Sequence, residues 1–89
     1  MKLPDLKWRR VKRADYYNLQ LYRGNRKLLS TWVKTNHFQL RSSWVFKGKR
    51  IQLTDARYDW YVWPGFGRRS LRRYGHLITH QKFTFNSEL

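Results

Sequence analysis

The sequence contains no cysteine in 89 residues, which excludes disulfides and thiolate metal sites. It has little acid, with five Asp and Glu against twenty Lys and Arg, and a formal net charge of +15. Its longest apolar run, residues 60–63, is far too short to span a bilayer, so we expect no membrane span. The residues after Met1 also lack the apolar stretch of a secretory signal. The absence of cysteine permits a reducing compartment without requiring one.

Residue patterns that carry catalysis are also missing. There is no seryl hydrolase motif, phosphate-binding glycine loop or dinucleotide fingerprint. His76 and His80 lie on a predicted strand, where residues four apart stand ~13 Å from each other, too far to share one metal ion. The few carboxylates form no spaced pair, and we expect Asp59 to pair with an Arg or Lys across the sheet. The sequence therefore predicts no catalytic residue, cofactor or metal, and a protein that is not an enzyme.

What the chain does contain is strand signals. Apolar and polar residues alternate over 16–22, up to a turn at Gly24, and residues 27–33 are predicted to form the return strand. Further short strands are predicted over 37–40, 44–46, 51–53, 58–63 and 76–85. Pro64 and Gly65 are expected to stop the strand over 58–63, because proline cannot donate to a ladder. The only helix candidate, residues 68–74, is short and rich in arginine.

The length allows one domain, residues 1–89, and short strands at this spacing predict an all-β fold, an antiparallel β-sandwich or small barrel. Sixteen aromatic residues supply enough apolar surface for one core. The predicted core comprises Leu6, Trp8, Tyr17, Leu19, Leu21, Leu29, Phe38, Leu40, Leu53, Tyr58, Trp60, Val62, Ile78 and Phe83.

Residues 53–63 resemble the stretch before and along strand F of fibronectin type III domains, with Tyr58 in the position whose hydroxyl closes a "tyrosine corner". Residues 6–8 and 14–21 resemble strands B and C. Residues 63–67 (Trp-Pro-Gly-Phe-Gly) and 74–78 (Tyr-Gly-His-Leu-Ile) are similar to segments of such domains in secreted bacterial, especially actinobacterial, proteins. The resemblance covers residues 4–85 and implies a fibronectin type III or immunoglobulin-like sandwich of six or seven strands. It also implies a secreted or cell-surface location, although the composition equally permits a cytoplasmic one.

One departure from this family concerns its first strand. Only seven residues precede Trp8, and Pro4 is among them, so strand A is predicted to be short or missing. An uncovered strand B would offer free N–H and C=O groups to another strand. The sequence thus allows self-association or a protein partner at this edge, unless the basic residues beside it keep other strands away.

The basic residues gather in three segments that we take as candidate anion-binding sites, because guanidinium and ammonium groups pair with phosphate, sulfate and carboxylate. The first is the predicted loop between strands F and G. The candidate residues are Arg68, Arg69, Arg72 and Arg73 in that loop, Lys47, Lys49 and Arg50 on a turn, and Lys7, Arg9 and Arg10 near the N-terminus.

Aromatic residues between these basic ones suggest two further ligands. Exposed rings stack on nucleic-acid bases, and strand parity could expose Tyr16, Tyr22, Tyr61, Trp63 and Phe66. Exposed rings also lie flat on sugars, but Trp60 and Trp63 fall on opposite faces of their strand and would not form one platform.

From the resemblance we expect a non-catalytic binding or scaffolding module that docks to anionic polymers of the cell envelope or to partner proteins. The alternatives are a small nucleic-acid-binding β-barrel, suggested by charge and aromatic content, and a subunit that self-assembles through an exposed edge strand.

Overall fold

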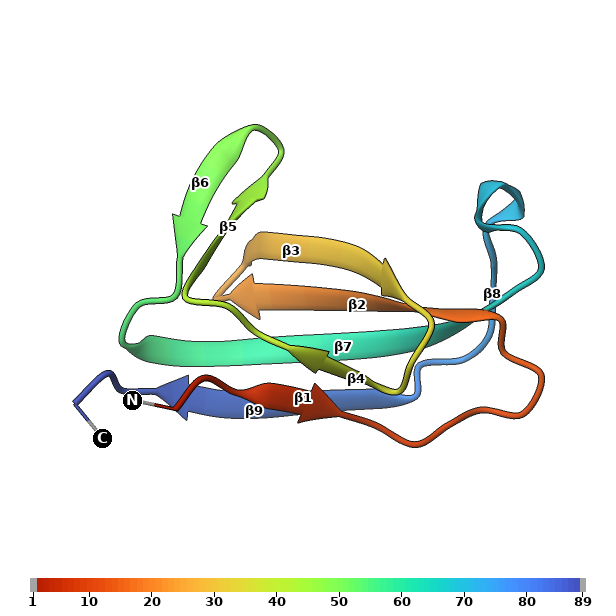
Figure 1. Ribbon diagram of the computed structural model, residues 1–89, viewed down its shortest axis with the longest axis horizontal. Helices are drawn as coiled ribbons and strands as arrows, with labels where there is room; N and C mark the ends of the chain where they lie inside the picture. The colour runs from red at the N-terminus through yellow and green to blue at the C-terminus, as the bar shows by residue number, and fades with distance from the viewer. Residues whose placement is uncertain (1, 89) are drawn as a thin grey trace.

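The computed structural model describes residues 2–88, which form nine antiparallel β-strands and one 3-10 turn (Figure 1). The elements, in chain order, are β1 (Asp5–Lys7), β2 (Tyr16–Arg23), β3 (Arg26–Val33), β4 (His37–Gln39), β5 (Ser43–Phe46), β6 (Lys49–Gln52), β7 (Ala56–Phe66), η1 (Arg69–Leu71), β8 (Arg73–Tyr74) and β9 (Thr79–Phe85). The prediction of an all-β, antiparallel sandwich is confirmed.

The larger layer is a five-stranded sheet with the order β3-β2-β7-β8, in which β9 also pairs with β7. β2 therefore lies between β3 and β7, and β7 is long enough to pair with β8 at its end and β9 along its first part. The smaller layer is the β1–β4 pair, which lies across one face of this sheet (Figure 1). The strands number nine rather than six or seven, because β8 has only two residues and β5–β6 is a separate hairpin.

The core lies between these two layers. It contains eleven of the fourteen predicted residues; Phe38, Ile78 and Phe83 are only partly buried and pack against its margin. Leu28, Ile51 and Phe85 are buried in it as well, although they were not among the predicted core residues. Tyr58 is fully buried, and its hydroxyl donates to the carbonyl oxygen of Thr54 at 2.8 Å, so the predicted tyrosine-corner hydrogen bond is present.

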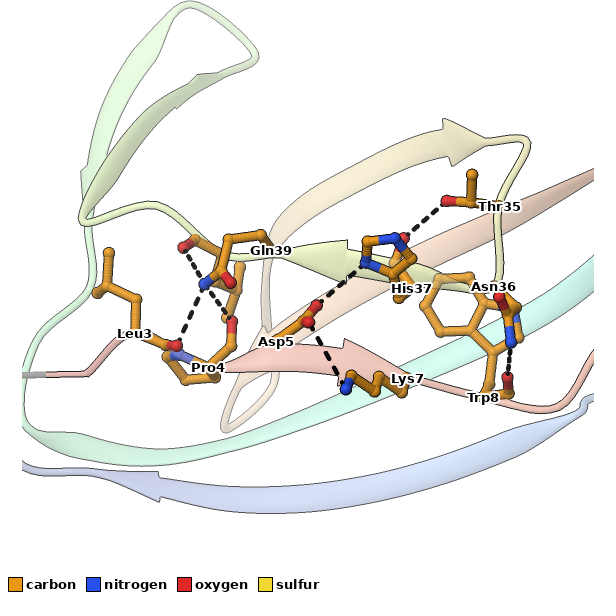
Figure 2. Close-up of polar contacts among 10 residues, drawn as sticks. Leu3, Pro4, Asp5, Lys7, Trp8, Thr35, Asn36, His37 and Gln39 are labelled. Carbon is orange, nitrogen blue, oxygen red and sulfur yellow. Dashed lines mark hydrogen bonds and ion pairs between the residues drawn. The ribbon is translucent and has the colours of Figure 1, made fainter.

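The short strand β1 is held to β4 by side chains at both ends (Figure 2). The Gln39 amide donates to the carbonyl oxygens of Leu3 and Pro4, at 3.1 and 3.0 Å. At the other end the Asn36 amide donates to the carbonyl oxygen of Trp8 at 2.9 Å. These bonds extend a ladder of three residue pairs, which by itself would be a weak attachment.

The prediction that Pro64 ends its strand is wrong. β7 continues through Pro64 and Gly65, which pair with β2, to Phe66, which pairs with β8. In an antiparallel strand the nitrogen and the carbonyl oxygen of one residue face the same neighbour. The Pro64 oxygen accepts from Gly75 N at 2.9 Å, so its nitrogen faces the gap between β8 and β9, and no bond to β2 is lost.

The β5–β6 hairpin is joined to the body by Ile51, which is buried in the core, and by Trp44, whose indole Nε1 donates to the Leu28 oxygen at 2.8 Å. Its two-residue loop consists of Lys47 and Gly48, with φ of 51° and 78°. Two successive positive φ values match a type I′ turn, the form that suits the twist of a hairpin. The loop thus carries Lys47 and Lys49 away from the sandwich (Figure 1).

Candidate functional site

The candidate site is the face of the five-stranded sheet that points away from β1 and β4, which we call the open face. Along β2, residues Tyr17, Leu19 and Leu21 point into the core, so the residues between them point to the open face. β7 has the same alternation, with buried Val62 between half-buried Tyr61 and Trp63. A polar and aromatic surface thus lies opposite the core.

Two tryptophans flank the middle of the open face. Asn18 of the central strand β2 is the register partner of Trp32 on β3 and of Trp63 on β7. Neighbouring strands lie ~4.8 Å apart, so the backbones of the two tryptophans are ~10 Å apart with Asn18 between them. They border a hollow of about 410 Å³, here called the Trp32–Trp63 hollow. Its lining residues are Asn18, Gln20, Ser30, Trp32, Trp63, Arg72 and Tyr74.

The floor of the Trp32–Trp63 hollow is a chain of hydrogen bonds. The Tyr22 hydroxyl donates to Gln20 Oε1 at 3.1 Å, and Gln20 Nε2 donates to Asn18 Oδ1 at 2.8 Å. Asn18 Nδ2 lies 3.3 Å from Ser30 Oγ and 3.2 Å from the Thr31 oxygen, and it can donate to both. Each amide is therefore fixed in one orientation, and Asn18, only 6% exposed, is satisfied.

A stack of rings fixes the Trp63 side of the hollow. Trp63 and Tyr61 are stacked with centroids 5.9 Å apart, and Tyr61 stacks on His80 at 4.2 Å. His80 Nε2 is in turn 2.8 Å from Asp59 Oδ1. The prediction that Asp59 pairs with an Arg or Lys is therefore wrong, because its partner is His80 on β9. His80 thus covers one face of Tyr61, and Trp63 borders the hollow.

Residues 67–73, which we call the Arg loop, bound the Trp32 side. The guanidinium carbon of Arg69 lies 5.2 Å from the centre of the Trp32 ring, a cation–π contact. Trp32 Nε1 donates to the Tyr74 hydroxyl at 3.2 Å, and Gly67 N donates to the Asp15 carboxylate at 2.6 Å. These contacts attach the loop to the sheet. Trp32, which is 46% exposed, belongs to the sheet and contacts Arg69 of the loop.

Two more hollows continue the Trp32–Trp63 hollow on either side. The first, of about 560 Å³, shares Trp32 and includes Lys34, Arg68 and Arg69. The second, of about 340 Å³, shares Trp63 and includes Tyr22 and Gly24. The three hollows follow one another along β2, and this series is here called the aromatic track.

Tyr16 is buried, although its position in the strand alternation suggested that it could be exposed. It points to the open face but is only 3% exposed, because its ring lies over Gly65 and meets Tyr74 edge to face at 5.9 Å. A Cβ on Gly65 would overlap the Tyr16 ring, so this packing requires glycine. Burial raises the pKa of the Tyr16 hydroxyl above its ordinary value of 10.0.

The structure does not bring the three predicted basic segments together. Arg68, Arg69, Arg72 and Arg73 lie in the Arg loop, beside the open face. Lys47, Lys49 and Arg50 lie on the β5–β6 hairpin, far from the Arg loop along the long axis of the molecule (Figure 1). Lys7 is on β1 in the other layer, and the exposed Arg9 and Arg10 follow it.

Acidic side chains neutralise very little of this charge. Within residues 2–88, Lys7 is the one lysine or arginine with a carboxylate within 4.0 Å, that of Asp5. The other aspartates bind different groups: Asp15 accepts from Gly67 N, Asp55 from Ser87 N, and Asp59 contacts His80. The positive charge of the Arg loop is therefore free to act on a ligand.

Sequence reasoning missed Trp32 as a site residue. Trp32 belongs to β3, where Ser30 and Trp32 lie on one face and Leu29, Thr31 and Val33 lie on the other. This alternation alone could have placed Trp32 away from the core. Its position opposite Trp63 depends on both strands pairing with β2, which no local pattern reveals.

Comparison of the chain with protein-family models, with curated proteins and with solved structures gave no match. In residues 2–88 there is no helix with the length and hydropathy needed to cross a membrane.

Proposed function

We propose that this protein is a non-catalytic binding module that holds an anionic polymer on the Arg loop and the adjoining open face. The observation that carries the proposal is the Arg loop itself: four arginines without a carboxylate within 4.0 Å in residues 2–88, attached to a sheet face with open hollows. Guanidinium groups match the oxygens of phosphate, sulfate and carboxylate. A net charge of +15 adds long-range attraction for any polyanion.

The resemblance to fibronectin type III domains supports a scaffolding role for this module. In this proposal β1, β2, β7 and β9 are the counterparts of strands B, C, F and G, and the corner hydrogen bond of Tyr58 supports that assignment. Domains of this kind carry their binding surfaces on loops at the ends of the sandwich, and the Arg loop is such a loop. On this basis we propose a secreted or cell-surface location and an envelope polymer as the ligand.

The test is a titration against heparin, duplex DNA and single-stranded DNA at increasing salt. We expect all three to bind at low salt and to weaken together as salt rises, because binding to a polyanion releases its counterions. A strong preference for the single strand that survives salt, with quenching of tryptophan fluorescence, would instead identify a nucleic-acid-binding domain. Absence of binding to every polyanion at low salt would refute the proposal.

A pair of charge-matched variants tests the role of the Arg loop. Each variant loses four positive charges, and asparagine replaces residues with positive φ, which it tolerates. The loop variant is Arg68→Ser, Arg69→Ser, Arg72→Asn and Arg73→Ser; the control is Lys47→Asn, Lys49→Ser, Arg50→Ser and Arg9→Ser. We expect the slope of log K against log salt to fall by about 3 to 4 in the loop variant and clearly less in the control. Equal losses would mean that total charge, and not the loop, governs binding.

A second candidate function is self-assembly through β1. The backbones of Pro4 and Trp8 bond to β4, so by alternation those of Asp5 and Lys7 face the other way. In residues 2–88 no strand pairs with that side of β1. Such an edge can accept a strand of a second copy.

A further inference from the structure

The Trp32–Trp63 hollow has the dimensions of a slot for a single ring. Atoms in van der Waals contact lie ~3.5–4.0 Å apart, so a flat ring between two indoles needs ~7–8 Å between them. The backbones of Trp32 and Trp63 are separated by two strand spacings, ~10 Å. Two indoles standing upright on these backbones would leave room for one ring above Asn18.

The slot combines three kinds of contact. Two of its lining residues are indoles, whose ring faces attract the weakly positive C–H edges of a ligand. Its floor is the oriented amides of Asn18 and Gln20, which offer hydrogen bonds to neutral hydroxyl groups. Its rim carries Arg72, and Arg69 lies next to it over Trp32. A suitable ligand thus has an apolar ring face, hydroxyl groups and a negative charge in one unit.

We propose that the Trp32–Trp63 hollow binds a sugar ring of an acidic polysaccharide, with the carboxylate or sulfate of the sugar on Arg72 or Arg69. This inference rests on the proposed function, because it names the class of anionic polymer that the module holds. The uncompensated positive charge around the hollow excludes a cationic ligand.

The aromatic track allows the polymer chain to continue beyond the slot. From Tyr16 to Tyr22 the strand rises ~3.4 Å per residue, which gives a track of ~20 Å. The neighbouring hollows lie toward Arg68 on the Trp32 side and toward Tyr22 on the Trp63 side, and each can receive a further unit of the polymer. A ring within a long chain can enter, and binding does not require a chain end.

The same features disfavour single-stranded nucleic acid. Such ligands use a series of exposed rings on which successive bases stack. Here His80 stacks on Tyr61, Trp63 lies next to it with a nearly parallel ring, and Tyr16 is buried beside Tyr74. The rings of Trp32, Trp63 and Tyr74 line one hollow instead of forming a row of platforms.

The experiment compares three probes of similar charge: oligogalacturonate, inorganic polyphosphate and oligo(dT). Titrations at ~0.15 M salt follow tryptophan fluorescence and heat, with the natural chain and with Trp32→Ala, Trp32→Phe and Trp63→Phe. The control is Leu77→Ala, an exposed apolar residue that lines none of the three hollows. Circular dichroism verifies that each variant is folded.

We expect the affinity for oligogalacturonate to be at least about tenfold higher than that for polyphosphate. Trp32→Ala should remove this difference without changing the affinity for polyphosphate. Trp32→Phe and Trp63→Phe should keep part of the advantage, and Leu77→Ala all of it. Equal affinity for oligogalacturonate and polyphosphate would overturn the sugar slot while leaving the proposed anion binding intact. Tighter binding of oligo(dT) with the same dependence on Trp32 would replace the sugar with a base. Binding of none of the probes at any salt would refute the proposed function itself.

Discussion

Thr54 and Tyr58 exchange two hydrogen bonds at the start of β7. Thr54 N donates to the Tyr58 hydroxyl at 2.9 Å, and the same hydroxyl donates to the Thr54 oxygen at 2.8 Å. The Tyr58 ring is fully buried and stacks on Phe83 of β9, with centroids 5.2 Å apart. One side chain thus joins the turn before β7 to the core and to the neighbouring strand.

This relationship predicts that Tyr58→Phe lowers the free energy of unfolding by about 1–2 kcal/mol, since it keeps the ring but leaves two backbone groups without their partner. Urea unfolding of the variant and the natural chain measures the difference. Tyr61→Phe is the control, because it also removes a phenolic hydroxyl but from a half-buried ring on the open face; its effect should be smaller. Equal stability of Tyr58→Phe and the natural chain would count against the corner as a stabilising contact.

Gly65→Ala should lower the free energy of unfolding by about 1–3 kcal/mol, because the added methyl group overlaps the Tyr16 ring and overpacks a closed site. The ring should move toward Tyr74 and disturb the Trp32 side of the open face. Thermal unfolding followed by near-UV circular dichroism reports both effects. Gly48→Asn is the control: its φ of 78° suits asparagine and nothing lies within 4 Å. A fully stable Gly65→Ala would mean that Tyr16 has room to move aside.

Much of this fold can be predicted from local sequence patterns. The alternation of Tyr17, Leu19 and Leu21 marks β2 and its buried face, because side chains on a strand alternate between two faces. Tyr58 could be assigned its corner because the bond joins residues only four apart. The place of Pro64 could not be predicted, since it depends on the gap between β8 and β9, which is fixed by the path of residues 75–78.

The site was harder to predict than the fold for the same reason. The Arg loop was visible as a charge cluster, but its contact with Trp32 joins residues far apart in the sequence. The burial of Tyr16 depends on the missing side chain of its cross-strand partner Gly65. Such contacts follow from strand register, and register is not apparent until the order of strands in the sheet is known.

The free edge of β1 predicts an association that depends on salt. Two copies of charge +15 repel each other at low salt, and screening removes this repulsion at high salt. We therefore expect a monomer at low salt and dimers at high salt and high protein concentration, measured by sedimentation velocity.

Lys7→Pro should abolish this dimer, because it removes an outward N–H without breaking a bond to β4. Lys12→Ser, which removes the same charge from a loop outside β1, is the control and should leave dimerisation unchanged. A single monomeric species at every salt concentration would rule out pairing through this edge.

Because Asn18 lies in the polar floor of the Trp32–Trp63 hollow, we expect its substitution to change ligand affinity more than the stability of the fold. In Asn18→Leu the amide between two indoles is replaced by an apolar group of similar size, so lost hydrogen bonds are offset by burial of apolar surface. We expect the free energy of unfolding to change by less than about 1 kcal/mol, while oligogalacturonate affinity falls about tenfold or more, because Gln20 loses its orienting partner. Ser30→Ala, at the side of the floor, is the milder control. A loss of stability above about 2 kcal/mol with unchanged affinity would mean that Asn18 serves to join β2 to β3 and not to receive a ligand.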